Sequence, residues 1–352
     1  MEREELISIV DKLEKEKSLS LEEYTTLIKG YSPSLAQYAA KKAMQAKEKI
    51  YGNKVFIRGL IEISNICKND CYYCGIRKSN KNCDRYRLTK EEIWNCCDQG
   101  YELGFRTFVL QGGEDGYFTD EILGDIVSYI HKKYPDCAIT LSMGERSKES
   151  YEKLFAAGAT RYLLRHETAE KEHYQQLHPE EMSYKNRMQC LQELKKIGFQ
   201  TGCGFMVGSP AQSVENLAKD LKFIESFQPE MCGIGPFIPH KDTIYKDVKA
   251  GSVEMTCYLL SLIRLMHPGI LLPATTALGT LDDKGREKGI LAGANVVMPN
   301  LSPVSARKKY ELYNNKANIG AEAAEGLEEL RNRMKVISHE VVCDRGDIII
   351  KK

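Results

Sequence analysis

The chain has 352 residues, of which 50 are Lys or Arg and 49 are Asp or Glu, so its formal net charge at pH 7 is only +1. This balance argues against a nucleic-acid-binding or membrane-surface protein, because such proteins carry a concentrated basic surface. No apolar run approaches the roughly 18 residues of a membrane-spanning helix, and the N-terminus lacks an apolar signal core. We therefore expect a cytoplasmic protein with small-molecule or protein partners, whose twelve cysteines are reduced.

Residues 1–54 are predicted to form an N-terminal helical extension. Ser20 and Glu23 have the spacing of a capping box, in which two side chains satisfy backbone N–H groups at a helix start. Residues 35–50 carry apolar side chains at helical spacing. The extension ends where a different pattern begins.

After residue 54, short apolar segments alternate with amphipathic segments. Helix signals frame the amphipathic segments: Thr89 and Glu92 start one that stops at Gly104, and Ser183 precedes one that stops at Gly198. The apolar segments, which we predict to be strands, are 55–64, 106–111, 138–143, 161–166, 199–208, 231–237, 271–276 and 295–299. Strands that alternate with helices of this length pair in parallel through right-handed crossovers.

Eight such units match a (β/α)8 TIM-type barrel, the α/β architecture that we predict for residues 55–300. An open doubly wound sheet is disfavoured, because no predicted strand is followed by a G-x-G-x-x-G turn. Residues 301–352 are less regular and are predicted to form a C-terminal cap. In a barrel of this kind the chemistry lies at the carboxyl ends of the strands.

Cys67, Cys71 and Cys74 follow the first predicted strand, in the loop at that face. A structural zinc site normally has four protein ligands in two separated pairs, whereas this spacing is C-x3-C-x2-C with no second pair nearby. Cys83 could supply a fourth thiolate across a polar loop. A cubane iron-sulfur cluster takes one thiolate per iron, so three cysteines leave one iron open to another ligand.

The C-x3-C-x2-C spacing, with Tyr73 before the last cysteine, resembles the signature of the radical S-adenosylmethionine (SAM) superfamily. The resemblance implies a [4Fe-4S] cluster whose open iron chelates SAM and whose electron cleaves SAM to a 5′-deoxyadenosyl radical. Longer stretches resemble HydE, the family of radical SAM maturases of [FeFe]-hydrogenase; they include VLQGGED, RYLLRHETA, GIGPFIPH and PATTALGT. Methylornithine synthase and biotin synthase belong to sister families with the same three cysteines.

The resemblance also implies which residues bind SAM. Glu167 and Arg187 resemble the pair that fixes its methionine end, where a carboxylate meets the ammonium and a guanidinium meets the carboxylate. The glycines after the second strand let the backbone approach the amino group closely, although an ordinary turn is the alternative. The expected SAM-binding set is Tyr73, Gly112, Gly113, Glu114, Ser142, Glu167, Arg187, Met206 and Ile234.

A second set of residues is expected to line the substrate cavity. Most of them are polar residues in apolar strands, where a buried polar group without a partner costs roughly 1–3 kcal/mol. Arg165 in particular needs an anion or a carboxylate partner, and Glu145 or Glu167 could serve. The catalytic candidates are Arg165, Thr275, Thr276, Met231 and Tyr310, and the substrate-binding candidates are Gln111, Thr140, Met298 and Tyr313. For the methionines and tyrosines, core packing is the alternative.

The chain departs from the family in one respect. Some HydE sequences carry a further cysteine group near the C-terminus for an accessory cluster, but no cysteine lies between Tyr310 and Glu340 here. A second cluster is therefore not expected. Cys96, Cys97 and Cys190 fall on predicted helices and are expected to be ordinary thiols. Only Cys203 lies in a predicted strand near the place of the auxiliary cluster of biotin synthase, so sulfur donation is disfavoured.

The resemblance as a whole implies an enzyme of [FeFe]-hydrogenase H-cluster assembly. Its expected substrate is an organometallic iron-cysteine carbonyl cyanide precursor delivered by a partner maturase, and its expected partners are the other hydrogenase maturases and an external electron donor. A sister enzyme that rearranges or thiolates an amino acid is one alternative. A non-catalytic protein that holds a metal cluster is another.

Overall fold

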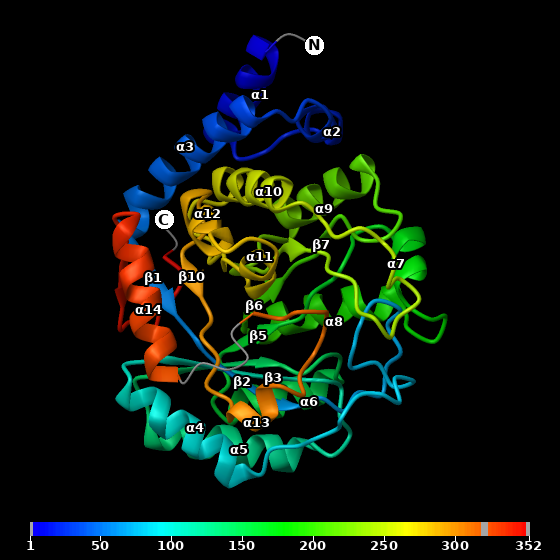
Figure 1. The fold of residues 1–352 in the computed structure, drawn as a ribbon, viewed down its shortest axis with the longest axis vertical. Coiled ribbons are helices and arrows are strands. Elements are labelled where there is room, and N and C mark those ends of the chain that lie inside the picture. Colours follow the sequence, from blue (N-terminus) through cyan, green and yellow to red (C-terminus); the bar gives the residue numbers. More distant parts are fainter. Residues whose placement is uncertain (1–2, 318–322, 350–352) are drawn as a thin grey trace.

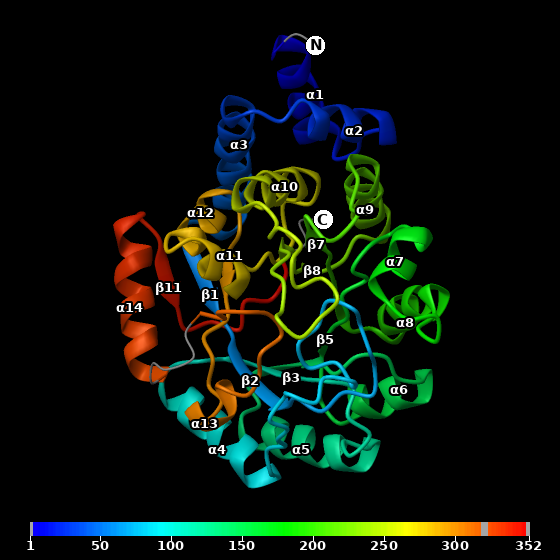
Figure 2. The same cartoon turned by 45° about the vertical axis from the view of Figure 1, so that its right-hand side comes forward.

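The computed structural model describes residues 3–317 and 323–349 (Figure 1). An arm of three helices comes first: α1 (Arg3–Glu16), α2 (Leu21–Lys29) and α3 (Pro33–Tyr51). The capping box expected at Ser20 and Glu23 is present at the start of α2. The arm packs outside the barrel helices, with α3 against α10 (Val253–Met266) and α2 against α9 (Val214–Phe227) (Figure 2).

Six parallel strands form the main sheet, in the order β2-β3-β4-β5-β6-β8. They are β2 (Gly59–Ser64), β3 (Thr107–Gly112), β4 (Ala138–Ser142), β5 (Arg161–Leu163), β6 (Gln200–Cys203) and β8 (Met231–Cys232). Most of their residues are buried, as expected for parallel strands covered on both faces. The predicted α/β fold class is therefore confirmed.

The pairing continues beyond this sheet. β1 (Lys54–Ile57), just before β2, pairs with β10 (Val296–Val297), and single bridges join Met231 to Leu271 and Pro273 to Val296. Beyond β6 and β8, β7 (Met206–Val207) pairs with β9 (Gly235–Pro236). The eight expected strand segments thus follow one another in barrel order. The segment at 271–276 makes bridges instead of a ladder, because Pro273 has no N–H to donate.

Most of the helices between the strands lie on the outside, as Figures 1 and 2 show. Besides α9 and α10 they are α4 (Lys90–Glu102), α5 (Asp120–Lys133), α6 (Lys148–Ala156), α7 (Lys171–Leu177), α8 (Tyr184–Ile197), α11 (Thr276–Leu281) and α12 (Gly285–Leu291). Thr89 and Glu92 form the expected capping box on α4, and Ser183 caps α8. Gly198 ends α8 in the left-handed conformation that favours glycine. None of the described helices is both long and apolar enough to cross a membrane.

The residues after β10 serve both ends of the barrel. α13 (Val304–Arg307) leads to a segment at the carboxyl ends of the strands. α14 (Ala323–Val336) leads instead to β11 (Glu340–Val342), which pairs with β1. Near the amino ends of the strands, the fully buried Arg161 donates to the Arg345 carbonyl at 3.0 Å and to Asp347 Oδ1 at 2.7 Å. The described residues of the expected cap at 301–352 are thus divided between the two ends of the barrel. The last of them cover the amino ends of the strands, so that the carboxyl ends of the strands remain available for chemistry.

Candidate functional site

A cavity of about 330 Å³ lies at the carboxyl ends of the strands. Its wall is formed by the loop after β2, the turn after β3, the end of β5, the β7–β9 region, the start of α11 and the segment after α13. The structure brings most of the sequence-predicted residues into this wall. They are Cys67, Cys71, Tyr73, Cys74, Gln111, Gly112, Gly113, Glu114, Ser142, Arg165, Glu167, Arg187, Met206, Thr275, Thr276, Tyr310 and Tyr313.

The cysteine loop, residues 65–88, is held by its own polar side chains. Arg85 donates to four backbone carbonyls, including that of Asn65 at 2.6 Å and that of Ile76 at 2.8 Å. Asn65 in turn donates to the carbonyls of Asp84 and Lys309 and accepts a bond from the backbone of Tyr86. Because these contacts tie both ends of the loop together, the three cysteines sit on an ordered scaffold.

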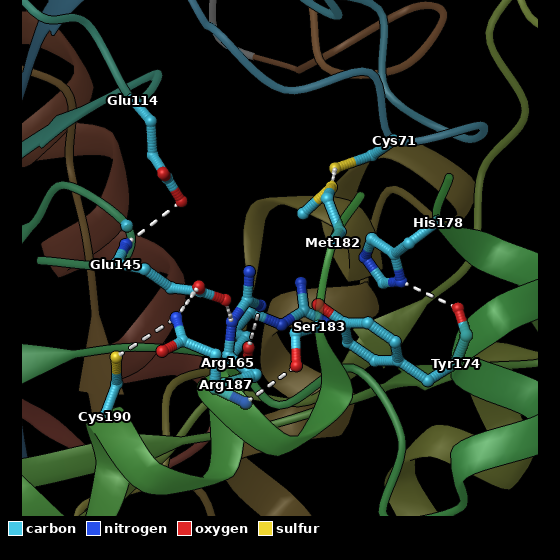
Figure 3. A network of polar contacts seen from close by, with 12 residues as sticks. Cys71, Glu114, Glu145, Arg165, Tyr174, His178, Met182, Ser183, Arg187 and Cys190 are labelled. Carbon is cyan, nitrogen blue, oxygen red and sulfur yellow. Dashed lines mark hydrogen bonds and ion pairs between the residues drawn. The ribbon is translucent and has the colours of Figure 1, made fainter. Parts of the chain in front are cut away.

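The three thiols share one electrostatic environment. Burial raises the pKa of Cys67, of Cys71 and of Cys74, the last to about 12, and neighbouring cysteines add to the shifts of Cys71 and Cys74. Cys71 Sγ lies 3.7 Å from Met182 Sδ (Figure 3). Thiols that resist ionisation when free become good ligands once a metal removes their protons, since metal binding deprotonates cysteine outright.

The turn after β3 lies directly against the cysteine loop. A Cβ on Gly113 would stand 2.3 Å from the carbonyl oxygen of Ile66, so only glycine fits there. The backbone N–H of Glu114 donates to Cys67 Sγ at 3.4 Å. Asp115 fixes the turn through two bonds from Arg87, at 2.6 and 2.9 Å. Close packing against the cysteine loop therefore requires glycine at position 113, whether or not a ligand also approaches the backbone there.

Two arginine–carboxylate pairs form the charged wall, and Figure 3 shows the pair of Arg187 and Glu145. Arg187, buried on α8, donates from Nε to Glu145 Oε1 at 2.6 Å and from Nη1 to the Arg165 carbonyl at 2.7 Å. Arg165 Nη2 lies 3.3 Å from Glu167 Oε2. Arg165 thus takes one of the two carboxylate partners considered from the sequence. Arg187 is buried, and its carboxylate partner in the protein is Glu145.

Aromatic side chains complete the wall near the cysteines. Tyr73 packs edge-on against His178, whose Nδ1 donates to the Tyr174 carbonyl at 3.0 Å, so its Nε2 can accept from the Tyr73 hydroxyl at 3.4 Å. Across the cavity, Gln111 donates to the Tyr310 hydroxyl at 3.4 Å. Both rings are therefore oriented before any ligand binds.

Four expected site residues do not line this cavity: Thr140, Met231, Ile234 and Met298. Met231 and Met298 pack in a small core with Leu271 and Val296, and Met231 Sδ accepts a bond from Arg58 at 2.9 Å. Ile234 is fully buried in the main core. The hydroxyl of Thr140 is buried and bonds to no described residue.

Several wall residues were not singled out from the sequence. Asn69, Gly144, Phe237, Ile238 and Leu312 line the cavity, and Glu145 holds Arg187. Glu145, just after β4, was considered from the sequence only as a partner of Arg165, whereas the structure pairs it with Arg187. Nothing in the sequence marks Leu312, because its segment reaches the cavity through tertiary packing alone.

No three His, Cys, Asp or Glu side chains of the described residues lie close enough to hold a single metal ion. Cys67, Cys71 and Cys74 nevertheless line one cavity, as the ligands of a larger cluster would, and the wall also offers both charges to an adjoining ligand. The three thiols share the cavity with a carboxylate at Glu167 and a guanidinium at Arg187. The hydroxyl of Thr275 in the same wall is buried without a hydrogen-bond partner among the described residues. Such a group is commonly satisfied by a ligand.

Comparison with known proteins agrees with this arrangement. The sequence profile of the radical SAM superfamily matches residues 61–224. The [FeFe] hydrogenase maturase subunit HydE of Thermotoga maritima is 45% identical over 273 residues, which make up 78% of this chain and 78% of that protein. The 3-methylornithine synthase of Methanosarcina acetivorans is 29% identical over 298 residues, 83% of this chain and 81% of that protein.

Solved structures show the same fold. The crystal structure of methylornithine synthase (PylB) has a TM-score of 0.82 at 24% identity, over 95% of this chain and 97% of that one. HydG, a maturase of the [FeFe]-hydrogenase, has a TM-score of 0.80 at 21% identity, over 96% of this chain and 76% of that one. The family profile and the 45% identical relative from Thermotoga maritima show that the chain is a radical SAM enzyme and belongs to the HydE family of [FeFe]-hydrogenase maturases.

Proposed function

We propose that this maturase binds a [4Fe-4S] cluster through Cys67, Cys71 and Cys74, binds SAM beside it, and acts on an organometallic iron-cysteine carbonyl cyanide precursor of the H-cluster. The observation that carries the proposal is that these three cysteines line the same cavity as the Arg165–Glu167 pair. When bound, the cluster and SAM supply a 5′-deoxyadenosyl radical.

The protein's own side chains bind and orient SAM in this proposal. The Glu167 carboxylate receives the ammonium group, and Arg187 receives the carboxylate, because each charge meets its opposite. The backbone of Gly112 to Glu114 approaches the amino group. Tyr73, Met206 and the 234–237 stretch offer apolar surface for the adenine, with Gly235, Pro236 and Phe237 in contact with the cavity in place of the Ile234 side chain.

The remaining polar wall is assigned to the substrate. Arg165 attracts an anionic group, such as a cysteine carboxylate or an iron-bound cyanide, and Thr275 and Thr276 face the same space. Gln111, Ser142, Tyr310 and Tyr313 border it. Met231, Met298 and Thr140 are assigned to packing, since they do not contribute to the cavity wall.

The proposal also includes partners. A maturase partner delivers the iron-cysteine precursor, and an external donor in the cytoplasm supplies the electron. The relative from Thermotoga maritima is named an [FeFe] hydrogenase maturase subunit, which supports work alongside other maturases. The described cysteines form no disulfides, which agrees with a reducing compartment.

The test is anaerobic reconstitution with iron and sulfide, followed by SAM and dithionite. The expected products are 5′-deoxyadenosine and methionine, and the reconstituted protein should restore hydrogenase activity to an extract that lacks this maturase. Cys83→Ala, in the same loop but outside the cavity wall, is the matched control for Cys71→Ala. SAM cleavage with formation of 3-methylornithine and without maturation would favour the sister activity.

A further inference from the structure

Glu167 has a left-handed backbone conformation, with φ 64°, which is uncommon for a residue that carries a side chain. Such a conformation costs free energy and persists only where surrounding contacts enforce it. The side chain forms part of the cavity wall, and the backbone N–H donates to the Gly204 carbonyl at 3.0 Å. The contacts that enforce this conformation therefore control where the carboxylate stands.

The preceding residue, His166, is fully buried and packs against the Phe223 ring at 4.7 Å. Its Nδ1 accepts a bond from the Gly204 backbone N–H at 3.2 Å, so Nδ1 is unprotonated and the proton lies on Nε2. Gly204 thus accepts a bond from Glu167 and donates one to His166. Nε2 of His166 lies 3.3 Å from Asp220 Oδ1.

Asp220 is a fully buried residue of α9. Its Oδ1 accepts a bond from the Ala169 backbone N–H at 2.6 Å and also faces His166. One carboxylate therefore holds residues on both sides of Glu167. Neither His166 nor Asp220 lines the cavity. They can therefore affect ligand binding only through the backbone of residues 166–169, which includes Glu167.

We propose that His166 and Asp220 are positioning residues, which hold Glu167 in the conformation that presents its carboxylate to SAM. This inference rests on the proposed role of Glu167 as the partner of the SAM ammonium. The alternative role for a buried His–Asp pair is to stabilise the core alone. The two roles differ in whether its loss acts on SAM binding through Glu167.

A double-variant cycle separates these roles. Asp220→Ala is expected to leave the iron content of the reconstituted protein unchanged and to weaken SAM binding about tenfold, since a misplaced carboxylate loses a charge-assisted bond. In a Glu167→Ala background, Asp220→Ala should have no further effect on SAM affinity. Additive losses in the double variant would overturn the proposal, because they would show an effect independent of Glu167.

Two variants on the same helix control for general destabilisation. Asp220→Asn keeps an acceptor for the Ala169 N–H and should retain SAM affinity within about threefold, since the bond to the backbone survives. Leu221→Ala removes a fully buried apolar side chain and should lower stability without weakening SAM binding. Equal SAM losses in Leu221→Ala and Asp220→Ala would contradict positioning.

A structural measurement keeps the inference separate from the proposed function. If Glu167→Ala binds SAM normally, Glu167 is not a SAM ligand, and the proposed role of Glu167 fails. The crystal structure of Asp220→Ala without cofactors still tests the positioning: a Glu167 that leaves the left-handed conformation supports it, and an unmoved Glu167 overturns it. If Asp220→Ala does not fold, His166→Asn takes its place, because Asn keeps an acceptor for Gly204 and loses the Nε2 donor.

Discussion

Arg187 Nε lies 2.6 Å from Glu145 Oε1, and this pair fixes a guanidinium in the wall of the cavity (Figure 3). Although burial opposes it, contacts with Tyr174 and Glu145 raise the pKa of Arg187, so the group is charged at any working pH. Its Nε and Nη1 are used by Glu145 and by the Arg165 carbonyl. Neither of these two bonds uses Nη2, which leaves it for an anionic ligand.

Replacing Arg187 by Lys should therefore weaken SAM binding while the cluster stays intact. Lys keeps the charge but cannot bond Glu145, the Arg165 carbonyl and a ligand at fixed angles. Loss of hydrogen bonds to a charged group is worth about 1.5–3 kcal/mol, or roughly a 10- to 150-fold weaker affinity. SAM titrations followed by EPR of the reduced cluster measure this. Lys185→Met, on an exposed position of the same helix, is the control.

The cysteine variants make the second prediction. A cluster of four irons held by three thiolates predicts an iron content of about four per reconstituted chain. Each of the variants Cys67→Ala, Cys71→Ala and Cys74→Ala should abolish the cluster. Cys83→Ala and Cys343→Ala should keep it, since neither side chain lines the cavity. Iron analysis and EPR distinguish these outcomes. A count near eight iron after desalting would reveal a second cluster that the sequence does not predict.

Local sequence signals predicted the elements and the outline of the site. Capping residues such as Thr89 and Ser183 locate helix starts, because their side chains act on backbone groups three residues away. The cysteine spacing, together with the family resemblance that singled out Glu167 and Arg187, indicated which loops meet. All of these signals depend on neighbours close in the chain.

Partner choice within the site was beyond the sequence. Glu145, Glu114 and Glu167 all stand near the carboxyl ends of strands, and only packing decides that Arg187 meets Glu145. Likewise, Met231 and Met298 are placed in the core by side-chain contacts with Leu271 and Val296, which strand patterns do not encode. The positive φ of Glu167 is also a tertiary effect, since Glu has no intrinsic preference for that conformation.

A buried lysine predicts how stability depends on pH. Lys47 Nζ lies 2.7 Å from His339 Nε2, and His339 Nδ1 donates to the Ile337 carbonyl at 2.7 Å, so Nε2 is the acceptor. Burial, with repulsion from Arg264, lowers the pKa of Lys47 to about 7 from an ordinary value of 10.5. Between these values the unfolded chain binds a proton that the folded chain does not. The contribution of Lys47 to stability therefore rises as the pH rises from 7 to 10.

Lys47→Met should remove this dependence and stabilise the protein most at pH 7 and below. The expected difference from the unmodified chain is about 2–4 kcal/mol at pH 7, falling by up to about 1.4 kcal/mol per pH unit above it. Urea unfolding of the cofactor-free protein at pH 7, 8 and 9 measures the difference. Parallel pH profiles of the two proteins would show that Lys47 is charged in the fold.

A buried ion pair between Lys316 and Glu62 anchors the segment that carries Tyr310. Lys316 Nζ bonds Glu62 in β2, which is fully buried, and the Tyr310 carbonyl at 3.1 Å. Lys316→Met would leave the Glu62 carboxylate without its cation, which costs roughly 3 kcal/mol. Thermal unfolding should show the loss, and hydrogen exchange should increase over residues 310–316. Lys308→Met, exposed beyond α13, should do neither.

The last prediction separates the SAM site from the substrate site at Arg165. Its Nη2 is 3.3 Å from Glu167 Oε2, yet Nε and Nη2 make no hydrogen bond to a described residue, and the side chain is 34% exposed. A cation held only by this loose ion pair can turn toward an incoming anion at small cost.

Arg165→Met should therefore keep the cluster and bind SAM with an affinity within about threefold of the unmodified protein, because the charged partners of SAM remain. It should nevertheless lose hydrogenase maturation. Arg165→Lys should recover part of the maturation, since it restores the charge without the fork. SAM binding, 5′-deoxyadenosine formation and maturation are measured on the same preparations. If Arg165→Met weakens SAM binding as much as Glu167→Ala does, the Arg165 guanidinium belongs to the cofactor site. Its role would then be to hold the Glu167 carboxylate in place for SAM.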